Sequence, residues 1–132
     1  LCDADTGALL TTLEGHHAAI NSCVFSPDGT RVSTTSNDGT LRLWDAATGL
    51  LLTTLEVVTA YAGRCVFSPD GARVLTAGTD GTARLWDAET GTLQTALKGH
   101  PGPVFSCAFS PDGKRAATAS DDRTARLWNA MY

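Results

Sequence analysis

The chain has 132 residues, of which 42% are apolar and 18% are charged, so it is long enough to bury a moderate hydrophobic core. Its net charge is −4, and its lysines and arginines form no cluster. Both features argue against binding to nucleic acid phosphates. No apolar run approaches the roughly 18 residues of a transmembrane helix. These features predict a soluble globular protein that binds neither nucleic acid nor membrane.

Short runs of apolar and β-branched residues, bounded by turn residues, follow one another along the chain and predict strands. The first four runs cover residues 9–13, 20–25, 31–36 and 40–45. Turns are expected at Ser26-Pro27-Asp28-Gly29 and at Asp38-Gly39, because proline fixes φ and glycine tolerates a positive φ. Further strands are expected over residues 50–55, 65–67, 74–76, 83–86, 93–97, 104–109, 116–119 and 125–128.

This strand-and-turn pattern repeats with a fixed period. All three tryptophans occupy one repeat position, at Trp44, Trp86 and Trp128, which are 42 residues apart. The motif Phe-Ser-Pro-Asp-Gly begins at residues 25, 67 and 109, and an Asp-Gly-Thr motif at residues 38 and 80 becomes Asp-Arg-Thr at residue 122. A Gly-His pair at residues 15–16 and 99–100 is Val57-Val58 in the middle copy. A period in the range of roughly 20–50 residues is typical of repeat architectures.

These motifs resemble those of the WD-repeat β-propeller family over essentially the whole chain. The resemblance implies an all-β fold, a β-propeller of four-stranded antiparallel blades, with three blades' worth of sequence in this chain. Residues 1–132 would form three WD repeats, at about 8–45, 50–87 and 92–129, as part of one propeller completed by another chain or by further residues. In the family, each repeat supplies the outermost strand of one blade and then the three inner strands of the next.

The family also implies a structural tetrad of hydrogen-bonded side chains in each blade. The matching residues are His16, Thr34, Asp38 and Trp44, then Thr76, Asp80 and Trp86 with Val58 in place of histidine, and finally His100, Thr118, Asp122 and Trp128. Thr34 and Trp44 are each five residues from Gly39, so we expect them to lie opposite each other across the hairpin. The indole N–H would then donate to the threonine hydroxyl, and Asp38 would accept from His16.

A histidine, a hydroxyl and an aspartate are also the components of Ser-His-Asp catalysis. Here the hydroxyl is expected in mid-strand and the set recurs, whereas an active site is normally unique, so we predict no catalytic residue and no enzymatic activity. The turn aspartates Asp28, Asp70 and Asp112 lie one per repeat without acidic neighbours at calcium-ligand spacing. We therefore predict turn formation there, and neither a metal nor a cofactor. A repeated scaffold contact is expected of three strand arginines, namely Arg42, Arg84 and Arg126.

Three of the four cysteines, Cys23, Cys65 and Cys107, also share one repeat position. Equivalent positions in neighbouring blades lie about 10 Å apart, whereas a disulfide requires Cα atoms within roughly 7 Å. We therefore predict three buried thiols that act as small hydrophobic side chains. Unbridged thiols favour an intracellular, cytoplasmic location, where the environment is reducing.

The resemblance implies a non-catalytic scaffold that presents one propeller face to a protein or peptide partner. By register, the face comprises Ala19, Asn21, Asn37, Tyr61, Gly63, Thr79, Pro103, Phe105 and Asp121. Tyr61 and Phe105 differ in kind from their equivalents in the other repeats, and aromatic residues are enriched among interface anchors. Two alternatives remain open, a self-assembling structural module and the sensor or regulatory region of a larger multidomain enzyme.

The expected strand order leaves both ends of the chain incomplete. Residues 104–129 form a blade without an outer strand, whereas residues 9–13 form an outer strand without a blade. Closed propellers hold about 4–8 blades, so we expect the free strand of one chain to complete the last blade of another. The sequence favours a six-bladed homodimer, with a nine-bladed homotrimer possible. The competing prediction is a fragment of a longer single-chain propeller.

Overall fold

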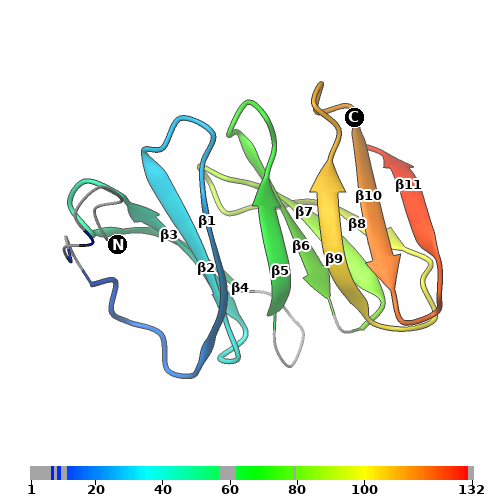
Figure 1. The fold of residues 1–132 in the computed structure, drawn as a ribbon, viewed down its shortest axis with the longest axis horizontal. Coiled ribbons are helices and arrows are strands. Elements are labelled where there is room, and N and C mark those ends of the chain that lie inside the picture. Colours follow the sequence, from blue (N-terminus) through cyan, green and yellow to red (C-terminus); the bar gives the residue numbers. More distant parts are fainter. Residues whose placement is uncertain (1–6, 8, 10–11, 57–61, 79, 131–132) are drawn as a thin grey trace.

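The chain folds into three antiparallel β-sheets that lie side by side (Figure 1). The computed structural model describes residues 7, 9, 12–56, 62–78 and 80–130. Blade one contains, in order of pairing, β1 (Ile20–Phe25), β2 (Arg31–Ser36), β3 (Thr40–Asp45) and β4 (Leu51–Glu56). Blade two contains β5 (Ala62–Phe67), β6 (Arg73–Gly78), β7 (Thr82–Asp87) and β8 (Leu93–Lys98). Blade three contains β9 (Val104–Phe109), β10 (Arg115–Ser120) and β11 (Ala125–Asn129).

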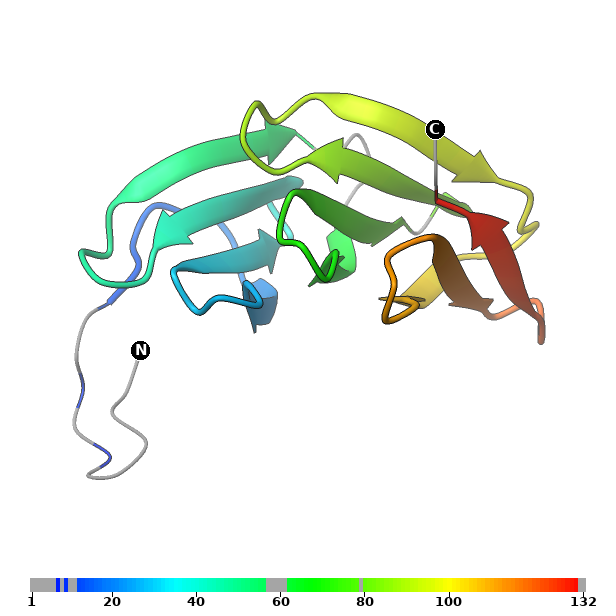
Figure 2. The same cartoon turned by 90° about the horizontal axis from the view of Figure 1, so that it is seen from above.

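The three blades form an arc (Figure 2). The strands β4 and β8 follow its convex edge, and β1, β5 and β9 lie on the opposite side. β1 contacts β5, and β5 contacts β9, so the innermost strands of successive blades are neighbours. This arrangement confirms the predicted all-β fold with propeller-type blades. The described part of the chain contains no helix, and hence none that could cross a membrane.

Each Ser-Pro-Asp-Gly turn is closed by the carboxylate of its aspartate. Asp28 Oδ1 accepts hydrogen bonds from the Ser26 hydroxyl at 2.7 Å and from the Thr30 amide at 2.9 Å. The bond from the Thr30 amide is the main reason that the pKa of Asp28 is lowered to about 2. Asp70 and Asp112 accept the equivalent serine hydroxyls at 2.5 and 2.6 Å. These carboxylates therefore serve the turns in which they lie.

The hairpin between the second and third strands differs in register from the prediction. Thr34 pairs with Arg42, so the prediction that Thr34 and Trp44 lie directly opposite each other is wrong. The cause is the turn, in which Gly39, at a φ of 84°, donates its N–H to the carbonyl three residues earlier at 3.2 Å. This centres the hairpin on Asp38, one residue earlier than assumed.

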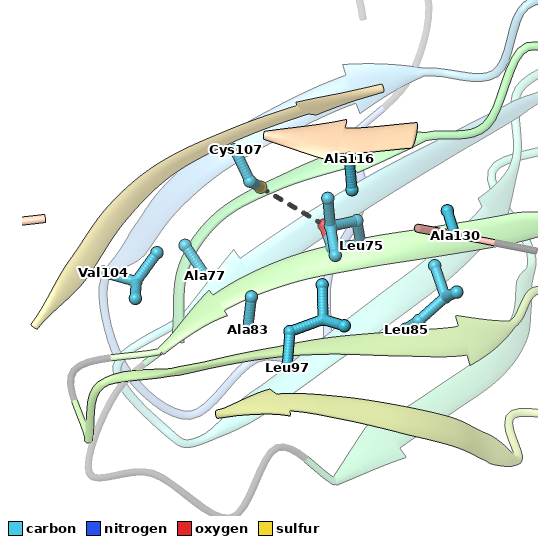
Figure 3. Close-up of a cluster of buried hydrophobic side chains, with 9 residues drawn as sticks. All are labelled: Leu75, Ala77, Ala83, Leu85, Leu97, Val104, Cys107, Ala116 and Ala130. Carbon is cyan, nitrogen blue, oxygen red and sulfur yellow. Dashed lines mark hydrogen bonds between the residues drawn. The ribbon is translucent and has the colours of Figure 1, made fainter. Parts of the chain in front are cut away.

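The hydrophobic core lies between blades. Between blades one and two it contains Leu41, Leu43, Leu55, Cys65, Phe67, Val74, Trp86 and Ala88. Between blades two and three it contains Leu75, Ala77, Ala83, Leu85, Leu97, Val104, Cys107, Ala116 and Ala130. Figure 3 shows side chains of this second cluster meeting between the two sheets, with the Cys107 thiol donating to the Leu75 carbonyl at 3.7 Å. Blade two is thus covered on both faces, whereas each outer blade keeps one face open.

The open face of blade one overturns one prediction. Cys65 and Cys107 are buried, at 1% and 9% exposure, but Cys23 is exposed, because none of the described blades covers its face of blade one. The strand expected over residues 9–13 is described only in part: Leu9 forms a β-bridge, Thr12 and Leu13 belong to no strand, and residues 10 and 11 lie outside the described residues.

Candidate functional site

The repeat residues of blade one form a continuous chain of hydrogen bonds. Trp44 Nε1–H donates to Thr34 Oγ1 at 2.8 Å, and the Thr34 hydroxyl donates to His16 Nε2 at 2.7 Å. His16 Nδ1–H in turn donates to Asp38 Oδ2 at 3.0 Å. These partners assign the proton of a neutral imidazole to Nδ1. The long indole reaches Thr34 across the diagonal of the hairpin, a distance that aromatic side chains can span.

Burial and hydrogen bonding act in opposite directions on the carboxylate of this chain. Burial by itself raises the pKa of Asp38. Hydrogen bonds from the Thr40 hydroxyl, the His17 amide and the His16 ring outweigh burial and hold that pKa well below its ordinary value. Asp38 is therefore ionised at neutral pH and ties the loop before β1 to the turn between β2 and β3.

Blade three contains the same chain of hydrogen bonds. Trp128 Nε1–H donates to Thr118 Oγ1 at 2.9 Å, Thr118 donates to His100 Nε2 at 2.7 Å, and His100 Nδ1–H donates to Asp122 at 2.7 Å. His100 and Thr118 are 6% and 1% exposed. Hydrogen bonds from the Thr124 hydroxyl and from His100 lower the pKa of Asp122 to about 2.

Blade two supplies a different partner for its aspartate. Trp86 Nε1–H donates to Thr76 Oγ1 at 3.0 Å, whereas Val58, at the histidine position, lies outside the described residues. Asp80 pairs instead with Arg84, whose Nη2 lies 2.6 Å from Asp80 Oδ2. Burial is the largest single influence on Asp80 and raises its pKa, but hydrogen bonds from Arg84 and the Thr82 amide, together with the charge of Arg84, lower the pKa overall. A strand arginine thus replaces the histidine as partner of the turn aspartate.

The threonine hydroxyl of each network is not available as a nucleophile. Thr34 is 4% exposed, accepts from Trp44 and donates to His16, so its oxygen is not presented to a substrate. A Ser-His-Asp triad instead needs an exposed nucleophile beside an oxyanion hole. Among the residues that the structure describes, no group of three or more His, Cys, Asp or Glu side chains could hold a metal ion. The networks connect loops to strands.

We expect His16→Ala to lower the free energy of unfolding by about 1–3 kcal/mol, because it leaves a buried carboxylate and hydroxyl without their partner. Urea denaturation followed by tryptophan fluorescence measures this change. The control is His17→Ala, since exposed His17 contacts Asp38 only through its backbone amide, at 3.0 Å. Equal denaturation midpoints for the two variants would contradict a structural role for the network.

The positions predicted for the partner-binding face lie where loops enter the innermost strands and where the hairpins turn. In blade one the exposed Ala19 and Asn37 are joined by a 2.9 Å hydrogen bond from the Asn37 amide to the Ala19 carbonyl. In blade three the exposed Pro103 and Asp121 are joined in the same way, at 3.2 Å. Each pair therefore lies on one edge of its blade.

The other members of this face are described to different extents. Phe105 is the second residue of β9, and its side chain is 50% exposed. Tyr61 and Thr79 lie outside the described residues. For Asn21 and Gly63 the structure describes only the backbone, in β1 and β5.

A contact that we did not predict from the sequence links blade one to blade two. Arg31, at the start of β2, donates from Nη2 to the Gly71 carbonyl at 2.7 Å and from Nη1 to the Ala88 carbonyl at 3.5 Å. Its guanidinium carbon also lies 5.6 Å from the centre of the Phe67 ring. This is a cation–π contact combined with two hydrogen bonds. We refer to such a set as an arginine clamp.

A second arginine clamp links blade two to blade three. Arg73 donates to the carbonyl oxygens of Gly113, at 2.9 Å, and Ala130, and its guanidinium carbon lies 5.6 Å from the centre of the Phe109 ring. Every partner is 42 residues beyond its counterpart in the first clamp. The signal was present in the sequence, because an arginine follows each Ser-Pro-Asp-Gly turn at the same distance.

Antiparallel blades that repeat every 42 residues and bury their cores against one another define the β-propeller class of repeat protein. The family model described as "WD domain, G-beta repeat" matches residues 7–45, 53–87 and 91–129. The chain therefore belongs to the WD-repeat family, as its motifs predicted.

Individual relatives match over the length of one repeat. The chain is 48% identical over 42 residues to a serine-threonine kinase receptor-associated protein from Dictyostelium discoideum. This match covers 32% of the chain and 14% of that protein. Identity and length are the same for nuclear distribution protein PAC1 of Arthroderma benhamiae and for vegetative incompatibility protein HET-E-1 of Podospora anserina. The match spans 9% and 3% of these two proteins, so the chain corresponds to a small part of each relative.

Proposed function

We propose that this chain is a non-catalytic scaffold that presents one face of a propeller to a protein or peptide partner. WD repeats generally mediate protein–protein interactions. The observation that carries the proposal is Phe105, an aromatic side chain on β9 that is 50% exposed. Its equivalents in the other repeats, Asn21 and Gly63, are not aromatic.

The surroundings of Phe105 suit a docking anchor. Val104, the preceding residue on β9, is 1% exposed and belongs to the core between blades two and three. The strand is therefore fixed by its buried face while the Phe105 ring is held outward, which limits the entropy lost when a partner covers the ring. The exposed Pro103 and Asp121 lie on the same edge of the blade and provide a mixed apolar and acidic rim.

We expect Phe105→Ala to weaken binding of a partner by at least about 10-fold, as the loss of an aromatic anchor does. The partner is first isolated with the full-length product by affinity capture and identified by mass spectrometry, and its affinity is then measured by calorimetry. The matched control is Leu52→Ala, which removes a 50% exposed apolar side chain from β4 on the convex edge. Unchanged affinity in the Phe105 variant would refute the docking face.

A regulatory region of a larger multidomain protein is the second candidate. It is favoured by the small share of the relatives that the chain covers, 3% in the case of the Podospora protein. In that case the chain would keep its docking role, and any catalysis would belong to another part of the polypeptide. A full-length product with a nucleotide-binding motif and measurable activity would support this candidate, whereas a full-length product made only of WD repeats would refute it.

We also propose that the three blades are part of a closed ring in a reducing, intracellular compartment. A six-bladed ring of two copies is favoured, because closed propellers hold about 4–8 blades and three copies would exceed that range. The open faces at both ends of the arc support closure. The thiols of Cys65 and Cys107 are free, and burial raises their pKa to about 11 and about 12, which favours the protonated form.

A further inference from the structure

The blade-three end of the arc carries half of an arginine clamp. Arg115 begins β10 at the position that Arg31 and Arg73 hold in β2 and β6. Arg115 is exposed, and within the described part of the chain its guanidinium makes no hydrogen bond. Beside it is an open hollow of about 400 Å³ lined by Lys114, Arg115, Leu127, Trp128 and Asn129.

The blade-one end carries the other half. Phe25 holds the position of the two clamped rings, yet it is 56% exposed, whereas Phe67 is 8% exposed. Gly29 and Ala46 hold the positions of the two carbonyl acceptors, by the same 42-residue shift that relates the internal clamps. The blade-three end of the arc therefore presents the arginine of a clamp. The blade-one end presents the aromatic ring and the two carbonyl groups that an arginine contacts in the internal clamps.

The side chains around the two half-clamps are more exposed than their equivalents between blades within the arc. Leu127 is 75% exposed, whereas Leu43 and Leu85, at the same repeat position, are 0% and 2% exposed. Ile20 is 49% exposed, whereas its equivalent Val104 is 1% exposed. The two end faces are thus the separated halves of an interface that forms twice within the chain.

We infer that Arg115 of one chain clamps Phe25 and the Gly29 and Ala46 carbonyls of a second copy, closing two arcs head to tail into a six-bladed ring. This inference rests on the proposed closed ring and adds the residues that hold it together. A second copy is the occupant that fits, because its blade-one face has the register and side chains of the faces already packed on blades one and two. Head-to-tail contacts of this kind end only when the ring closes, and two arcs give a blade number in the usual range.

The assembly is tested first by the mass of the full chain in sedimentation velocity at increasing protein concentration. We expect twice the 13.8 kDa of one chain. Arg115→Ala and Phe25→Ala should each raise the dimer dissociation constant by at least about 100-fold, because each ring contains two clamps and each tenfold change needs only about 1.4 kcal/mol. The double variant should do little more than either single variant, since both remove the same contact. Leu52→Ala, outside both end faces, should leave the constant unchanged.

Cysteine positions provide an independent geometric test. Cys65 Sγ lies 3.2 Å from Ser33 Oγ in the preceding blade, and Cys107 Sγ lies 3.7 Å from the carbonyl of Leu75. Position 117 is the next member of this series, 42 residues after Leu75. In the closed ring it lies against Cys23 of the second copy.

We therefore expect Ala117→Cys, in a Cys2→Ser background, to form an intermolecular disulfide with Cys23 when a mild oxidant removes two electrons and two protons from the thiol pair. Non-reducing electrophoresis would show a covalent species of two chains. Ser33→Cys in the same background is the matched control, because it places a thiol beside Cys65 within one chain and should leave the mass unchanged. Adding Cys23→Ser should abolish the intermolecular bond.

A mass of 13.8 kDa at every concentration, with an intact β-sheet circular dichroism signal, would overturn the inference and assign the end faces to further blades of a longer polypeptide. A dimer that neither crosslinks through position 117 nor weakens in Arg115→Ala would also overturn it, as would a three-chain mass. None of these results concerns Phe105, whose test is the affinity for a partner. The two proposals can therefore fail separately.

Discussion

Leu85→Ala is expected to lower the free energy of unfolding by about 2–5 kcal/mol, the range for a buried leucine that leaves a cavity. Leu85 lies on β7, is 2% exposed, and belongs to the cluster between blades two and three. Its neighbours there include Ala83, Ala116 and Ala130, whose short side chains cannot extend into the space that the isobutyl group vacates. Urea denaturation of the full chain at low protein concentration measures the loss.

The matched control is Leu93→Ala in the same blade, because Leu93 is 45% exposed on β8. It should change the free energy of unfolding by less than about 1 kcal/mol, since little apolar surface changes its environment. Leu127→Ala, at the same repeat position as Leu85 but 75% exposed, should also leave the dilute chain unaffected. Equal losses for Leu85 and Leu93 would show that the interface between blades two and three is not packed as described.

Gly81→Ala is expected to lower the free energy of unfolding by about 2–5 kcal/mol, because it adds a steric overlap to an unfavourable φ. Gly81 has a φ of 83°, and a Cβ built there would lie 2.4 Å from the His100 carbonyl oxygen and 3.2 Å from that of Gly102. Both obstacles are backbone atoms of the loop that leads into blade three. They cannot rotate away as a side chain can, so either the turn or the loop must move.

Gly29→Ala separates the two contributions. Gly29 has a similar φ of 75°, but a Cβ there meets no atom within 4 Å. It should therefore show only the backbone cost, about 1–2 kcal/mol. Thermal and urea denaturation of both variants give the difference. Equal losses of unfolding free energy for Gly29→Ala and Gly81→Ala would show that close packing of the blade-two hairpin against the next loop contributes nothing to stability.

Much of the fold follows from local signals, and the sequence alone predicted it. The Ser-Pro-Asp-Gly turns place a fixed φ, a side-chain acceptor and a permissive glycine in consecutive positions, so they reverse the chain in any context. The strands between the turns are short and rich in β-branched and apolar residues, and β1, β2 and β3 lie where that pattern predicted. The 42-residue period made each of these signals recur three times, which fixed the fold class.

The register within a blade depended on detail that spacing could not supply. A shift of one residue in the centre of the hairpin at Asp38 is enough to pair Thr34 with Arg42 and to move Trp44 to the diagonal position. The hydrogen bond from Trp44 to Thr34 survives because the indole is long enough to reach. Likewise, nothing in the sequence pattern indicated that Arg84 would pair with Asp80 where the histidine is missing.

By itself, the sequence determined which residues are equivalent, because equivalence depends only on the period. Only the tertiary structure decided which equivalent residues share an environment, because each blade is covered by its neighbours and the end blades have one neighbour fewer. Cys23, Phe25 and Leu127 are therefore exposed although their counterparts are buried or partly buried. The arginine clamps also arise between blades, and thus only after two sheets pack against each other.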